Sequence, residues 1–319
     1  MNELKKYNWM VCVHCATYNH APYIEDAMNG FCIQKTTFPF VCVIVDDAST
    51  DKECEVINDY MIEHFEHTDI TQIMEETEDY VMTFAQHKDN KNCFFAFHQL
   101  KYNHGSIKKS RVPYYTKWDN NAKYIARCEG DDYWIDSLKL QKQVDYMDNH
   151  PGHSLCFCSH KNLYPSGEIQ IETRYDADMD ECPMADIILG GGTYMATNSM
   201  LYSWSLYKQH DSSWAIGCPI GDVPLMLTLA NNGKVAFLND VMCVYRITSN
   251  GSWTSKMEQS FKLRWNHNRK IIRMWHQFDE WSNRKYHSLV CKKIRNNNEE
   301  IFKDAVLTLA RKVKSCCNI

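Results

Sequence analysis

Two short stretches of the sequence are apolar at almost every position, and they constrain the fold more than any other feature. Residues 9–15 read WMVCVHC, and residues 38–45 read FPFVCVIV. Runs of this length and composition are typical of β-strands that helices cover on both faces. The segment between them, residues 21–34, has apolar residues at a helical spacing, so a β-α-β unit is predicted. These apolar residues are Ile24, Ala27, Met28 and Phe31.

Strand-like and helix-like segments continue to alternate after this unit. Residues 54–65 have helical apolar spacing, and residues 93–100 (CFFAFHQL) and 123–128 (KYIARC) are strand-like, with a helix-like segment at 108–121 between them. Residues 69–92 are polar and irregular, and they indicate no clear element. This alternation predicts an α/β fold with a mostly parallel central sheet flanked by helices.

Polar clusters follow three of the predicted strands. CATYNH (15–20) follows the first strand, DDASTD (46–51) the second and CEGDDYW (128–134) the fourth. Because ligands of open parallel sheets bind at the carboxyl ends of the strands, we expect these segments to converge on one crevice. No Walker lysine motif and no GxGxxG opens a helix here, which argues against a P-loop ATPase or a nicotinamide enzyme.

The third cluster places Glu129, Asp131 and Asp132 within four positions. Neighbouring carboxylates repel one another unless a cation, a shared proton or bulk water relieves them. Alone, such a loop is more often a solvated turn. Together with the other two clusters it favours a hard divalent cation, Mn2+ or Mg2+, which prefers oxygen ligands and would offset the charge on a departing diphosphate.

Charge and cysteine usage limit the partners. From residue 256 onward there are 15 Lys and Arg against 6 Asp and Glu, and the earlier part has 20 against 34, so the end carries about +9 and the body about −14. The acidic body argues against nucleic acid, whereas the basic end fits either an anionic lipid surface, an acidic neighbour or a solvated helical face. The fifteen cysteines lie mostly in apolar runs and are interpreted as reduced thiols, with no structural zinc.

No signal peptide and no long apolar run is apparent in the sequence, so we expect a cytoplasmic protein whose basic end could contact the inner face of the membrane. The oligomeric state is not predicted.

The motifs TYNH, VDDASTD and CEGDDYWIDSLKLQKQ together resemble glycosyltransferase family 2, the inverting sugar-nucleotide enzymes with the GT-A fold. The resemblance covers roughly residues 8 to 255. It implies a Rossmann-like GT-A catalytic domain over residues 1–255, with a nucleotide-binding half at about 1–135 and an acceptor half at about 136–255. A basic helical extension, residues 256–319, would follow.

By this resemblance CEGDDYW corresponds to the family's DxD element. Metal coordination would fall chiefly on Asp131, and Asp132 or Glu129 would be neighbours to metal or ribose, although Glu129 stands where Asp is commoner. The resemblance further implies five nucleotide-binding residues and one that covers the donor. Ala16, Thr17 and Tyr18 would cradle the nucleoside, Asp47 would accept from the base, typically uracil N3, Arg246 would contact the diphosphate, and Trp253 would close over the donor or pack in the core.

A second region, residues 191–204 and 219–253, resembles the acceptor side and catalytic helix of the family. Asp222 falls where the family keeps its general base. Read without the resemblance, Asp222 begins an apolar helical stretch, as a helix-capping Asp would. Thr248 stands where similar sequences have His, which would weaken the grip of that loop on the metal.

The resemblance implies an inverting glycosyltransferase of hexosyl or N-acetylhexosaminyl class. It would move one sugar from a nucleotide-sugar, UDP-linked by preference, to a hydroxyl of a glycan or lipid-linked acceptor, as in polysaccharide biosynthesis. The first alternative is a catalytically silent sugar-nucleotide or glycan-binding module. The second is a sugar-phosphate nucleotidyltransferase, which CATYNHAPY disfavours because it has no glycine, arginine or lysine to hold a triphosphate.

Overall fold

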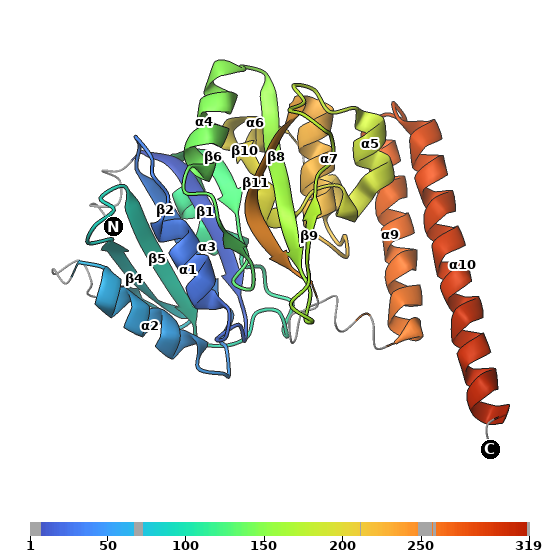
Figure 1. Ribbon diagram of the computed structural model, residues 1–319, viewed down its shortest axis with the longest axis horizontal. Helices are drawn as coiled ribbons and strands as arrows, with labels where there is room; N and C mark the ends of the chain where they lie inside the picture. Colours follow the sequence, from blue (N-terminus) through green and yellow to red (C-terminus); the bar gives the residue numbers. More distant parts are fainter. Residues whose placement is uncertain (1–7, 67–72, 211, 248–256, 258–259, 318–319) are drawn as a thin grey trace.

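The computed structural model describes residues 8–66, 73–210, 212–247, 257 and 260–317. Along the first half of the chain, helices separate single strands or short groups of strands (Figure 1). In chain order they are β1 (Trp9–Thr17), α1 (Ile24–Cys32), β2 (Phe40–Asp46), α2 (Glu53–His64), β3 (Ile73–Glu76), β4 (Tyr80–Gln86), β5 (Cys93–Leu100), α3 (Val112–Asp119), β6 (Ala122–Arg127) and β7 (Tyr133–Trp134).

The second half adds further strands to the same sheet and ends in two long helices. Its elements are α4 (Lys139–Asn149), β8 (His153–Leu163), β9 (Ile169–Glu172), α5 (Met184–Gly190), the short helices η3 (Gly191–Thr193) and η4 (Thr197–Ser199), β10 (Leu201–Ser203), α6 (Trp204–Gln209), η5 (Ser213–Ala215), α7 (Asp222–Asn232), β11 (Lys234–Arg246), α9 (Phe261–Trp281) and α10 (His287–Cys317).

The sheet is mixed, and its parallel part lies at the centre. Its order is β3-β4-β5-β2-β1-β6-β10-β8-β11-β7, and β9 pairs with β8. Strands β5, β2, β1 and β6 pair in parallel, as do β8 and β11, whereas β4 and β10 pair antiparallel with their neighbours. The predicted α/β fold and its buried parallel strands are therefore confirmed.

Strands β3 and β4 were not expected, because residues 69–92 look irregular in the sequence. They form an antiparallel hairpin on the edge of the sheet beside β5. In β4 the side chains of Met82 and Phe84 are buried, while Tyr80 and Val81 are only partly covered. Because this edge of the sheet is partly exposed, polar residues are tolerated in it. The alternation of apolar and polar residues that would indicate a strand is therefore hard to recognise in the sequence.

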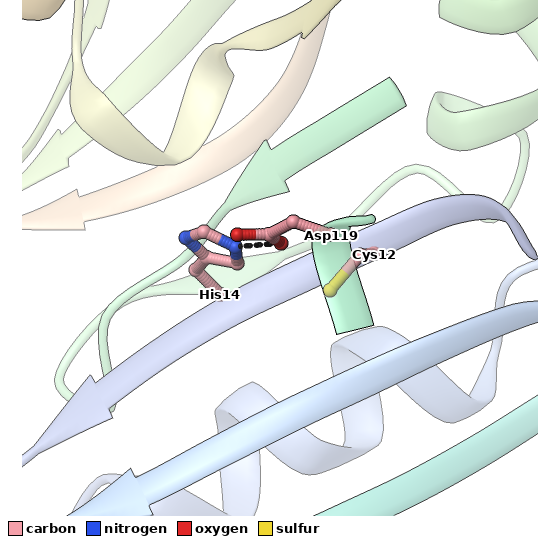
Figure 2. A group of neighbouring side chains, drawn as sticks. All are labelled: Cys12, His14 and Asp119. Atoms are coloured by element: carbon pink, nitrogen blue, oxygen red, sulfur yellow. Dashed lines mark hydrogen bonds and ion pairs between the residues drawn. The ribbon is translucent and has the colours of Figure 1, made fainter. Parts of the chain in front are cut away.

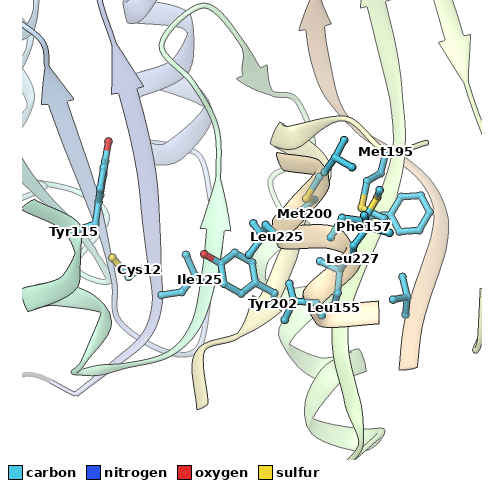
Figure 3. Close-up of a cluster of buried hydrophobic side chains, with 14 of the residues drawn as sticks. Cys12, Tyr115, Ile125, Leu155, Phe157, Met195, Met200, Tyr202, Leu225 and Leu227 are labelled. Carbon is cyan, nitrogen blue, oxygen red and sulfur yellow. The ribbon is translucent and has the colours of Figure 1, made fainter. Parts of the chain in front are cut away.

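The continuous apolar runs are explained by two hydrophobic clusters, one on each face of the sheet. Alternate residues of β2 enter opposite clusters: Val43 packs in one and Ile44 in the other. Helices α1, α2 and α4 cover one face, and α3, α7 and α9 cover the other. Figure 3 shows the cluster that α3, α7 and α9 cover, in which Leu225 of α7 lies near Ile125 of β6 and Leu227 of α7 lies near Leu155 of β8.

The C-terminal helices pack against the sheet domain. Trp275 and Phe278 of α9 are buried in the same cluster as α7, and α10 packs on α9 and α5. The last turns of α10 extend past the N-terminal end of α9 (Figure 1). Within the described part of the chain, no helix combines the length and the hydrophobicity needed to cross a bilayer. Cysteines whose side chains are described are free thiols, most of them buried.

Gly30 of α1 lies against the backbone of β7, and this contact yields a test of the packing. A Cβ at this position would lie 2.8 Å from the backbone nitrogen of Trp134, which cannot move aside as a side chain could. Gly30→Ala should lower the free energy of unfolding by about 2 kcal/mol, because overpacking outweighs the gain of about 1 kcal/mol in helix propensity. Urea denaturation measures this change.

Gly192→Ala is the matched control, because its Cβ would meet only Val223 at 3.5 Å, an ordinary contact. Equal stabilities of the two variants would contradict the close approach of α1 and β7.

Candidate active site

Three segments that are distant in the sequence meet at the carboxyl ends of β1, β2 and β6. The amide of Gly130 donates to the carbonyl of Ala16 at 3.1 Å, and the amide of Asp47 donates to the carbonyl of Thr17 at 3.1 Å. The end of β1 is therefore hydrogen-bonded to the loops on both sides of it, and the expected convergence is observed.

Gly130 allows residues 128–132, called here the acidic loop, to lie directly on the end of β1. A Cβ on Gly130 would come within 2.1 Å of Oγ1 of Thr17 and 3.1 Å of Ile24. The hydroxyl of Thr17 is fixed in place because it donates to Glu53. A side chain at position 130 would push the loop away from β1, so the position of the three acids depends on this glycine.

Glu53, the first residue of α2, is hydrogen-bonded to the end of β1 and to the loops that follow β1 and β2. It was not assigned to the site from the sequence. Its fully buried carboxylate accepts from the amide of His20 at 2.9 Å, from Oγ of Ser49 at 2.8 Å and from the hydroxyl of Thr17. Burial raises the pKa of this carboxyl above its usual value. An acid in the first turn of a helix is common, so nothing in the sequence indicates that this one joins two loops.

The acidic loop gathers the three predicted carboxylates. Glu129, Asp131 and Asp132 each offer an oxygen, and these atoms lie within 4.8 Å of one another. Asp132 is almost fully buried; its Oδ1 accepts from the amide of Arg246 at 2.8 Å, and its Oδ2 has no partner among the described residues. Nε2 of His20 lies 3.7 Å from Oδ2 of Asp131.

The electrostatics of this loop favour a bound cation. Burial, reinforced by the charge of Asp131, raises the pKa of Asp132 well above its usual value. Burial also raises the pKa of Glu129, although the nearby Arg127 opposes the rise. A buried oxygen without a donor beside two further carboxylates is a poor arrangement for isolated acids. An oxygen-only set of this kind fits a hard divalent cation.

Arg246, at the end of β11, holds the acidic loop. Its Nη1 donates to the carbonyl of Asp131 at 2.7 Å, its guanidinium forms an ion pair with Asp26 of α1, and it lies 4.5 Å from the ring centroid of Tyr133. These contacts fix its orientation, and the expected contact with a diphosphate stays a prediction. Trp253 and Thr248 lie outside the described residues.

Asp47 is engaged by a fourth segment that the sequence reasoning did not assign to the site. Its buried carboxylate accepts from the amides of His104 at 2.7 Å and Gly105 at 3.0 Å. Nη1 of Arg111 lies 3.5 Å from Oδ2 of Asp47. The signal was available, because NHGSIKKSR follows the strand β5 and so belongs to the same sheet edge. A contact between Asp47 and a base stays a prediction.

The residues expected to cradle a nucleoside divide into two kinds. Ala16 and Thr17 use their carbonyls to anchor neighbouring loops, and Thr17 is buried. Tyr18 is 37% exposed and is the aromatic side chain of this group that remains accessible to a ligand.

Asp222 is the first residue of α7. Gly221 occupies the N-cap position, and no side-chain hydrogen bond caps this helix, so the interpretation of Asp222 as a helix cap is wrong. Its charge contributes to the raised pKa values of both Glu129 and Arg127, so its carboxylate lies within electrostatic reach of the acidic loop. The fold therefore brings a further partly exposed carboxylate to the same region.

Another cluster with metal-ligand residue types lies deeper in the fold, between β1 and α3. Nε2 of His14 lies 2.6 Å from Oδ1 of the buried Asp119, and Cys12 is adjacent (Figure 2). Burial lowers the pKa of His14, and Asp119 opposes this effect. The histidine satisfies the carboxylate, so His14 is a hydrogen-bonded core histidine.

Asp132→Asn tests the cost of the acidic cluster. Asparagine keeps an oxygen for the amide of Arg246 and removes the buried charge. Because the folded-state pKa of Asp132 is raised, wild-type stability falls as pH rises through the range between the unfolded and folded values. The variant should therefore have a free energy of unfolding about 1 kcal/mol higher at pH 7, with the gain shrinking toward acid pH.

Urea denaturation at several pH values, with and without Mn2+, measures this. Mn2+ should stabilise the wild type more than the variant. A destabilised variant that responds to Mn2+ as the wild type does would contradict the role given to this carboxylate.

Curated proteins with a similar sequence include mycobacterial relatives that are themselves described as uncharacterized. No family model matches the chain. The uncharacterized protein Rv1520 of Mycobacterium tuberculosis (strain ATCC 25618 / H37Rv) and the uncharacterized protein Mb1547 of Mycobacterium bovis are each 31% identical over 244 residues. The match covers 75% of this chain and 59% of the length of each relative.

Solved structures are similar over most of the chain. TarS of S. aureus (residues 1–349) in complex with UDP has a TM-score of 0.52 and 16% identity, over 87% of this chain and 72% of that one. Mannosyltransferase PcManGT from Pyrobaculum calidifontis, in complex with GDP-Man and Mn2+, has a TM-score of 0.50 and 12% identity, over 98% of this chain and 81% of that one. Both neighbours are GT-A glycosyltransferases, and this chain has the same GT-A fold.

Proposed function

We propose that the protein is an inverting glycosyltransferase of family 2. It would transfer one sugar from a nucleotide-sugar, UDP-linked in the first instance, to a hydroxyl of a glycan or lipid-linked acceptor. The observation that carries the proposal is the cluster of Glu129, Asp131 and Asp132 at the strand ends of a GT-A fold, with Asp222 within electrostatic reach of Glu129. The neighbours TarS and PcManGT were solved with UDP, UDP-GlcNAc or GDP-Man, which supports a nucleotide-sugar as the ligand class.

Asp131, with Asp132 or Glu129, would hold Mn2+ or Mg2+. The set fits such an ion because it offers only oxygen ligands and includes a buried oxygen to which no described residue donates. Once bound, the ion would offset the negative charge that builds on the diphosphate as it leaves. Arg246 keeps the loop and its carboxylates in a fixed position through the carbonyl of Asp131.

The remaining residues would act on the two substrates. Tyr18 offers an exposed ring to the base, and the buried Asp47, held by backbone amides, offers an acceptor to it. Asp222 would take the proton of the acceptor hydroxyl, which then attacks the anomeric carbon from the face opposite the diphosphate. A single displacement of this kind inverts the configuration at that carbon.

Asp222→Asn tests the general base. The substitution keeps the size of the side chain, so UDP binding measured by calorimetry should be nearly unchanged. Transfer should fall by about 100-fold or more, the usual scale for loss of a general base. The assay is UDP release from a panel of UDP-hexoses and UDP-N-acetylhexosamines, with water or simple glycosides as acceptors. Asp186→Asn, an exposed acid in the first turn of α5, is the control. Normal transfer by the Asp222 variant would remove its catalytic role.

Asp131→Asn tests the metal assignment. The variant should lose metal-stimulated turnover, because it removes the carboxylate on which coordination chiefly falls. A titration of Mn2+ against turnover in the same assay measures this loss, and Asp145→Asn on the exposed side of α4 serves as the control. Retained activity with unchanged Mn2+ dependence would show that another group holds the ion. Binding of UDP without turnover of any donor by the wild type would instead favour a catalytically silent module.

A further inference from the structure

The free end of the α9–α10 hairpin exposes an unusual number of large apolar side chains. Helices in water normally keep such residues toward the core. Here the exposed ones come from the start of α9 and the second half of α10, and they are 44–67% accessible. They are Leu263, Trp265, Phe302, Val306 and Leu307.

These side chains surround the helix pair instead of forming one flat face. The ion pair between Arg264 and Asp304, with Nε to Oδ2 at 2.7 Å, marks the line along which the two helices touch. At about 100° per residue, the two exposed neighbours of Arg264 lie about 160° apart around α9, and Phe302 and Leu307 lie about 140° apart around α10. A rigid, flat partner would cover only one side of this end, whereas a fluid medium can surround it.

The same end of the chain is strongly basic. Residues 261–317 contain 14 Lys and Arg against 5 Asp and Glu. Lys262 and Lys303 stand among the exposed apolar residues, and Arg311, Lys312 and Lys314 follow in the last turns of α10. Apolar and aromatic side chains mixed with lysine and arginine are typical of helices that lie in the interface of an anionic bilayer.

The position of this end relates it to the candidate active site. The last turns of α10 extend on the side of the molecule toward which the parallel strands β1 and β5 run (Figure 1). The acidic loop lies at the carboxyl end of β1, so this loop and the free end of the hairpin share one side.

We propose that the free end of the α9–α10 hairpin docks on an anionic lipid surface. Trp265, Phe302 and Val306 would enter the boundary between headgroups and acyl chains, and Lys262 and Lys303 would contact the headgroups. Docking in this orientation turns the acidic loop toward the bilayer, where the lipid-linked acceptor of the proposed function would lie. The docking itself needs no nucleotide or metal, so it stands independently of the proposed activity.

Vesicle co-sedimentation of the full chain tests the proposal. Vesicles of phosphatidylcholine with about 30% phosphatidylglycerol should bind the protein, salt should weaken the binding, and pure phosphatidylcholine should bind it at least tenfold less. Phe302→Glu should reduce binding to the anionic vesicles by about tenfold or more. Ile62→Glu on α2 is the matched control, because it also replaces an exposed helical apolar residue, 60% accessible against 67% for Phe302, and adds the same charge.

Circular dichroism and UDP binding show whether both variants are folded, so that loss of vesicle binding is not mistaken for unfolding. Equal binding of the two variants, or no preference of the wild type for anionic vesicles, overturns the proposal. Light scattering provides the opposing outcome: a wild-type dimer that Phe302→Glu dissociates, with no vesicle binding, would show that a second copy covers this surface. A failure of nucleotide binding would overturn the proposed function and leave this result untouched.

Discussion

The contact between the acidic loop and the end of β1 is the interaction on which the rest of the site depends. Gly130 donates its amide to Ala16 and has no Cβ to meet Thr17, so the loop can follow β1 closely. This contact brings the acids that follow β6 near the loop that follows β2. Glu53 joins that loop to β1, because it accepts hydrogen bonds from both Ser49 and Thr17. Arg246, at the end of β11, donates a hydrogen bond to the carbonyl of Asp131 in the acidic loop. Chain segments from both halves of the fold are thus fixed around one small group of carboxylates.

Such a group costs stability unless something binds to it. Burial and mutual repulsion raise the pKa values of Asp132 and Glu129, and one oxygen of Asp132 has no donor among the described residues. The surrounding fold holds these groups through a rigid sheet and two hydrophobic clusters, which can supply the stability that the loop lacks. Under the proposed function, a bound cation would relieve this repulsion and would offset the charge on the departing diphosphate.

Much of the fold followed from the sequence because buried parallel strands leave a direct record in continuous apolar runs. The rule that ligands bind at strand ends then brought the right loops together. Residues whose role depends on tertiary contacts were missed: Glu53 looks like an ordinary helix-start acid, and Arg111 approaches Asp47 only after β5 is placed. The edge hairpin of β3 and β4 was missed because an exposed edge tolerates polar residues. The position of Asp222, one residue after the N-cap, also required the structure.

We propose that the acidic loop forms a metal-dependent site for a nucleoside diphosphate. Calorimetric titration of UDP into the purified protein, first with Mn2+ and then with EDTA, measures this dependence. UDP should bind with Mn2+, and EDTA should weaken the binding by at least tenfold, with GDP as the comparison ligand. Binding of neither UDP nor GDP under either condition, or binding that is indifferent to EDTA, would contradict this proposal.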